Sequence, residues 1–135
     1  MARPLGVTLI AAYEAFSGAV RLVLGLGLVA AGSLAAKLAS MVSEHNIFSR
    51  FLSGMGKVIG IAVILTALLH LSAGFGLWSM KAWGRSMTLL LAVLGMLLFL
   101  PTLVHPHPFG FGAMVINGLI VIYLLMGGVK SSFGA

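Results

Sequence analysis

No charged residue occurs between Ser86 and Val129. A membrane-spanning helix needs about 20 apolar residues, so this run is too long for one span and must turn. The turn is predicted at the His-Pro-His-Pro segment of residues 105–108, because proline removes a backbone donor and disfavours helix in the residue before it. The run therefore predicts two membrane-spanning helices joined by a proline-rich turn.

Composition extends this prediction to the whole chain. Of the 135 residues 61% are hydrophobic, and only eight Lys or Arg and two acidic residues carry charge. A soluble domain of this size has about a quarter of its residues charged. The pattern predicts an all-α polytopic membrane protein of one domain, residues 1–135, with four transmembrane helices in an antiparallel bundle. The four apolar stretches cover about residues 5–35, 58–80, 86–104 and 109–129.

The segment 37–57 differs from these stretches, because it contains Lys37, Glu44, Arg50 and Lys57. Its apolar residues recur at roughly helical spacing. This pattern predicts an amphipathic helix that lies in the membrane interface between the first two spans. A docking surface for a partner protein is the alternative interpretation.

Basic residues indicate the orientation of the chain. With four spans both termini lie on one side, and the positive-inside rule places that side in the cytoplasm by four basic residues against three. We therefore expect a multi-pass protein of the cytoplasmic (inner) membrane with both termini in the cytoplasm. The terminal side carries Arg3, Lys81, Arg85 and Lys130, and the other side carries Lys37, Arg50 and Lys57.

Aromatic and basic residues near the predicted membrane surface indicate how the chain contacts lipid headgroups. Trp78, Trp83 and Arg85 flank the turn between the second and third spans and are predicted interface anchors. Basic residues beside a bilayer attract anionic lipids. Because they are divided between two faces, they are a poor footprint for nucleic acid, which is not expected as a partner.

One face of the first span carries Glu14, Gly18, Arg21, Gly25 and Gly32, the four others lying within about 40° of Glu14 at 100° per residue. Small residues allow another helix to approach closely. A charge facing lipid costs at least about 2.5–3.5 kcal/mol. We therefore expect this face to meet the bundle interior or a partner. A structural charge pair, an arginine that meets another subunit, and a proton or ion relay are the open interpretations.

Depth in the membrane suggests further partners for Glu14. Counted from the terminal side, His70 lies at a similar depth and Tyr123 slightly shallower, so a cluster of the three is expected as one arrangement. His70 is also a candidate axial ligand for haem or chlorophyll, since neutral imidazole binds both. A hydrogen-bonded core histidine is the plainer alternative, and no other cofactor is predicted.

Several kinds of chemistry are excluded. The chain has no Cys and no Asp, and its two carboxylates, Glu14 and Glu44, fall in different segments. No serine has a readable base beside it, as an activated nucleophile needs. His105 and His107 lack a third ligand nearby, so no metal site is predicted. The chain is not expected to be an enzyme, and no catalytic residue is assigned.

The order of short motifs along the chain resembles a known group of proteins. In this layout the chain is similar to small four-helix prokaryotic membrane proteins catalogued as a domain of unknown function, of the 2127 type and its relatives. The resemblance covers nearly the full chain. It implies a four-helix fold without an assigned activity, and it supplies no catalytic residues. The motifs are Arg3-Pro4-Leu5-Gly6-Val7-Thr8, Gly74-Phe75-Gly76-Leu77-Trp78, Trp83-Gly84-Arg85, Asn117-Gly118 and Tyr123-Leu124.

Three functions remain as expectations. The first is an accessory or scaffold subunit of a larger membrane complex, such as a respiratory or photosynthetic one, which binds other membrane subunits or further copies of itself. The second is a small proton-coupled transporter that uses Glu14 and has to oligomerise, because four helices enclose little cavity. The third is a protein that binds haem or chlorophyll through His70.

Overall fold

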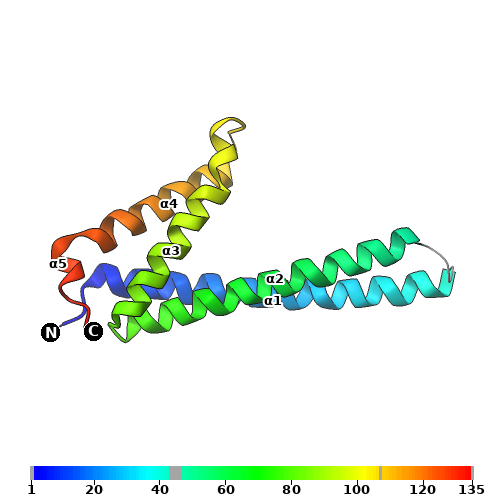
Figure 1. The fold of residues 1–135 in the computed structure, drawn as a ribbon, viewed down its shortest axis with the longest axis horizontal. Helices are drawn as coiled ribbons and strands as arrows, with labels where there is room; N and C mark the ends of the chain where they lie inside the picture. Colours follow the sequence, from blue (N-terminus) through cyan, green and yellow to red (C-terminus); the bar gives the residue numbers. More distant parts are fainter. Residues whose placement is uncertain (1, 43–46, 107, 135) are drawn as a thin grey trace. The chain divides into compact units, whose positions relative to one another are not determined.

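The computed structural model describes residues 2–42, 47–106 and 108–134. Every named element in these ranges is helical, so the predicted all-α fold is confirmed (Figure 1). The elements are α1 (Leu5–Val42), α2 (Ile47–Trp78), α3 (Ala82–Leu98), the 3₁₀ helix η1 (Leu100–Leu103), α4 (Pro108–Leu125) and α5 (Gly127–Lys130).

Three helices are long and apolar enough to cross a membrane, namely Leu5–Leu38 in α1, Ser53–Trp78 in α2, and α4. The third predicted span begins earlier than expected and is shorter, because α3 covers 17 residues. Pro101 lies at the start of η1, just after the end of α3. α4 ends at Leu125 because Met126 has an extended backbone conformation, with ψ of 132°.

The predicted single domain appears as two compact units. Unit 1 comprises Met1–Ala15 and His70–Ala135, and unit 2 comprises Phe16–Leu69. α1 and α2 each contribute to both units. Unit 1 therefore holds the start of α1, the end of α2 and all later elements, and unit 2 is a helical hairpin.

Small residues bring α1 and α2 together in unit 2. Gly18, Gly25 and Gly32 of α1 recur every seventh residue, as do Ser53, Gly60 and Ala67 of α2; we call these six residues the small-residue seam. All six are buried. A Cβ on Gly60 would lie 2.9 Å from the carbonyl oxygen of Gly25. The Ser53 hydroxyl donates a 2.9 Å hydrogen bond to the carbonyl of Gly32.

This seam corrects the prediction of a separate interfacial helix over 37–57. Lys37 to Val42 continue α1, and Ile47 to Lys57 begin α2; Glu44 lies outside the described residues. The small side of the segment faces the other helix of the hairpin, because backbones approach closely only where side chains are small. The small residues of α2 recur at every seventh position, and this spacing indicates the packing already in the sequence. The segment also has the spacing of an amphipathic helix, which led to the wrong prediction.

The core of unit 1 joins the start of α1, the end of α2, α3, α4 and α5. Its buried hydrophobic residues are Val7, Ala11, Leu77, Ala92, Ile120, Leu124 and Val129. Gly76 and Gly84 let α2 and α3 cross at close range, since a Cβ on Gly76 would lie 2.6 Å from the Cα of Gly84. Asn117 of α4 packs on Gly95 of α3, because a Cβ added to Gly95 would lie 2.8 Å from Nδ2 of Asn117.

Both described chain ends and the α2–α3 turn meet at one end of unit 1, which we call the terminal end. Arg3 donates a 2.8 Å hydrogen bond to the carbonyl of Trp78, and its guanidinium lies 3.7 Å from the centroid of that indole. The amide of Ala82 donates to the carbonyl of Gly134 at 3.0 Å, and the amide of Gly134 donates to the carbonyl of Met80 at 3.1 Å. These bonds bring the termini together on one side of unit 1.

Candidate functional site: a buried Glu–His pair and an unpaired arginine

Glu14 and His70 form a hydrogen-bonded pair within unit 1, between Nδ1 of the imidazole and Oε2 of the carboxylate. Their side chains are 2% and 13% exposed, respectively. A buried carboxylate is costly unless it has a partner, and the imidazole supplies one. The depth match expected between these two residues is thus a direct contact.

Gly74, one turn beyond His70 on α2, explains why the two helices are close enough for this contact. A Cβ on Gly74 would lie 3.1 Å from both the carbonyl oxygen of Ala11 and the amide nitrogen of Ala15. Because glycine leaves this space empty, the α2 backbone packs against α1 next to Glu14. His70 and Glu14 are then held face to face by the helices that carry them.

The pair has defined chemical capacities. When Glu14 is ionised, Nδ1–H of a neutral His70 donates to the carboxylate, and Nε2 remains as an acceptor. The pair can therefore accept one further proton at Nε2, which gives an imidazolium beside the carboxylate. Histidines that bind metals usually donate their other ring N–H to a carboxylate or carbonyl in the same way, so this geometry also suits an axial ligand.

Tyr123 lies elsewhere in unit 1. Its ring packs on Gly6, where an added Cβ would lie 2.6 Å from Cε1 of the tyrosine. Gly6 precedes Glu14 by about 12 Å of helix rise. The structure thus places Tyr123 nearer the terminal end and gives it a packing role against a glycine.

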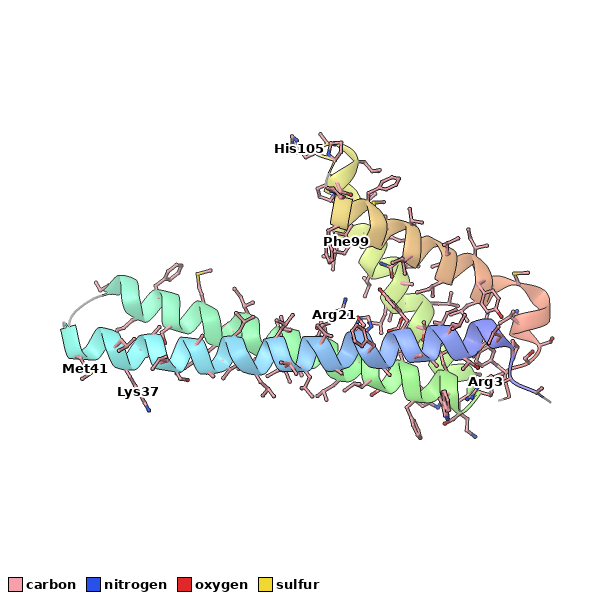
Figure 2. The ribbon with its side chains drawn as sticks, turned by 180° about the vertical axis from the view of Figure 1, so that it is seen from behind. Arg3, Arg21, Lys37, Met41, Phe99 and His105 are labelled. Carbon is pink, nitrogen blue, oxygen red and sulfur yellow. The ribbon has the colours of Figure 1, made fainter. Side chains whose placement is uncertain are left out.

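Arg21 is the second polar feature, in unit 2. Nη1 of its guanidinium is buried and has no hydrogen-bond partner in the part of the chain that the structure describes. Gly25 of α1 contacts Gly60 and Ile64 of α2, so the antiparallel register of the hairpin places Arg21, one turn before Gly25, level with the turn of α2 from Ile64 to Leu68. Figure 2 shows Arg21 projecting from α1.

The predicted glycine face is buried as expected, since Gly18 and Gly25 are both buried in unit 2.

The predicted interface anchors have additional contacts. Trp78 stacks under Arg3, and Trp83 covers Gly76, with 2.9 Å from its ring to a Cβ placed there. Arg85 donates from Nε to the carbonyl of Leu124 at 2.9 Å. A cation at a helix C-terminus is favourable, so Arg85 also caps α4, a role the sequence pattern did not predict.

In the described ranges no three His, Cys, Asp or Glu side chains come together in a cluster that could hold a metal ion. His105 is exposed in the turn before α4 (Figure 2), and His107 lies outside the described residues. The interpretation of this segment as a turn agrees with its place between η1 and α4.

No protein-family model matches the chain. Comparisons with curated proteins and with solved structures found no match either. The resemblance to four-helix membrane proteins of the 2127 type therefore stays a prediction that rests on the motifs quoted above. The function has to be argued from the Glu14–His70 pair, from Arg21 and from the exposed surface.

Proposed function

We propose that the chain is a four-span integral membrane protein that serves as an accessory or scaffold subunit of a larger membrane complex. The observation that carries this proposal is Nη1 of Arg21, which is buried and finds no hydrogen-bond partner among the described residues. An unsatisfied buried donor costs about 1–3 kcal/mol, and more when it is charged. A carboxylate or backbone carbonyl from a neighbouring helix would remove this cost.

The acceptor is expected to come from another chain. The chain has two carboxylates, Glu14 and Glu44. In the described structure Glu14 is buried against His70. A different subunit with an acidic residue or an exposed carbonyl in its membrane helix is the simplest partner for Arg21.

The hairpin of unit 2 provides a second argument. About 20 residues suffice to cross a bilayer, whereas α1 has 38 residues. The excess length carries exposed apolar side chains near the hairpin end, where Lys37 and Met41 lie (Figure 2). Exposed apolar patches outside the hydrocarbon core mark surfaces that bind other proteins. The exposed apolar side chains beyond the two candidate spans are Met41, Ile47 and Phe51.

Replacement of Arg21 with leucine tests the proposal. Loss of one partner from a buried, hydrogen-bonded charge pair costs about 2–5 kcal/mol, so we expect co-purification of the partner subunit in mild detergent to fall more than tenfold. The isolated chain should be equally stable or about 1–3 kcal/mol more stable, because an unsatisfied donor is removed. Quantitative mass spectrometry and chemical denaturation measure the two effects.

Lys57→Leu is the matched control, since it removes an exposed positive charge from the same hairpin but away from the apolar side chains at its end. We expect it to leave the partner bound. If the wild-type chain purifies from its native membrane with no co-eluting subunit, or if Arg21→Leu retains the partner while destabilising the isolated chain, Arg21 has a purely internal role and the proposal fails.

Proton-coupled transport is the second candidate, and the Glu14–His70 pair favours it. Buried ionisable residues in membrane helices commonly form proton relays. The accessory role instead predicts that a pH gradient across proteoliposomes decays at the same rate with the wild-type chain and with Glu14→Gln. A pH-sensitive dye inside the vesicles measures the decay. A decay that is fast with the wild type and slow with Glu14→Gln would establish transport.

A further inference from the structure

An apolar groove of about 600 Å³ lies within unit 1, between the start of α1 and the second half of α4, and it opens to the outside. Gly6, Leu9 and Tyr13 line it from α1, Ile116 and Leu119 line it from α4, and Met126 lines it just after α4 ends. Its walls are almost entirely apolar. Leu9 and Leu119 are each 62% exposed, so the protein itself leaves the groove uncovered.

The groove has the length of one lipid leaflet. From Ile116 to Leu125 α4 rises about 14 Å, and half of a hydrocarbon core about 30 Å thick is about 15 Å. Gly6 and Met126 form its shallow end, because the ring of Tyr123 contacts Gly6 there. Tyr13 and Ile116 belong to its deep end. The shallow end adjoins the terminal end of unit 1.

Positive charge gathers beside this shallow mouth. Lys130 occupies the last turn of α5, which follows Met126 directly, and Lys81 is held beside Gly134 by a backbone bridge. Both lysines are exposed. Glu14 is the sole acidic residue in the sequence of unit 1, and in the described structure it is buried against His70. The mouth of the groove is therefore complementary to an anion.

We propose that this groove is a binding site for one anionic glycerophospholipid, with an acyl chain against α1 and α4 and the phosphate at Lys81 and Lys130. The inference rests on the proposed membrane location and is independent of the accessory role. A protein helix in the groove would account for the apolar walls, but a lipid accounts for the walls, the leaflet length and the adjacent cations together.

Native mass spectrometry of the full chain in detergent tests the headgroup. Phosphatidylglycerol and phosphatidylcholine with identical acyl chains serve as probes. Each lysine near a membrane surface favours an anionic lipid by about fivefold, so we expect one phosphatidylglycerol to bind about 25-fold more tightly than phosphatidylcholine. Lys81→Gln combined with Lys130→Gln should abolish this preference. Arg50→Gln combined with Lys57→Gln, in unit 2, is the control that should retain it.

Leu119→Trp tests the acyl-chain site, because a larger side chain would fill the groove. We expect it to weaken binding of both lipids at least tenfold. The control Leu97→Trp, at a 55% exposed position of α3 outside the groove, should leave binding unchanged. Circular dichroism confirms that each variant is folded.

Several results would overturn the lipid site. These are equal affinity for the two lipids, undiminished binding by Leu119→Trp, and a second copy or another protein bound in place of lipid and lost with Leu119→Trp. A failure of the membrane location is distinguishable, because the chain would then purify as a monodisperse protein without detergent.

Discussion

Replacement of Gly84 with alanine is expected to lower the free energy of unfolding by about 3 kcal/mol, at the upper end of what overpacking costs. A Cβ at Gly84 would lie 2.5 Å from the Cα of Gly76 and 2.6 Å from the amide nitrogen of Leu77. Both are backbone atoms, so rotation of a side chain cannot relieve the overlap. Denaturation of the purified chain in detergent measures the change.

Gly112→Ala is the control for this prediction. Gly112 is a glycine of α4 in the same unit, and a Cβ there meets no atom within 4 Å. Because alanine favours a helix more than glycine does, we expect a gain of about 0.5–1 kcal/mol. Equal effects of the two substitutions would show that the close approach of α2 and α3 does not stabilise unit 1.

Removal of either member of the Glu14–His70 pair is expected to destabilise the chain, and by different amounts. His70→Leu leaves a carboxylate buried without a partner, which costs about 3–5 kcal/mol. Glu14→Leu leaves an imidazole with an unsatisfied ring nitrogen, which costs about 1–3 kcal/mol. The free energy of unfolding of each variant, measured under the same conditions, gives the order.

The double variant, with leucine at both positions, separates a paired contact from two independent ones. Apolar replacement of both members of a buried ion pair is often neutral. We therefore expect it to be more stable than His70→Leu alone. Additive losses in the double-mutant cycle would indicate that the residues act separately, and a larger loss from Glu14→Leu than from His70→Leu would contradict the buried carboxylate as the costlier group.

Parts of the candidate site could be predicted from the sequence. Helical periodicity alone placed Glu14, Gly18 and Gly25 on one buried face, because 100° per residue is a local property of the helix. Helix rise alone brought Glu14 and His70 to the same depth. Rotation about each helix axis, which decides contact, depends on packing between helices. For this reason Tyr123 was equally plausible as a partner, although it lies against Gly6.

The segment 37–57 shows where sequence reasoning failed. Its apolar residues repeat with helical spacing, and both an interfacial helix and one side of a hairpin produce that pattern. The hydrogen bond from Ser53 to Gly32 in the small-residue seam shows that this part of α2 packs on α1 as one side of the hairpin. Arg85 is a similar case: its position beside Trp83 predicted an interface anchor, whereas its bond to the Leu124 carbonyl depends on where α4 ends in space.

The sequence by itself determined that the chain is helical and suited to a membrane, because hydrophobicity and proline placement act locally along the chain. It also determined that Glu14 and Arg21 point to the same side of α1. Only the tertiary structure decided that Glu14 has a partner in His70, while Nη1 of Arg21 has no hydrogen-bond partner among the described residues. The reason is that contact depends on the register between α1 and α2, which is set by glycines that allow close approach and which brings His70 against Glu14.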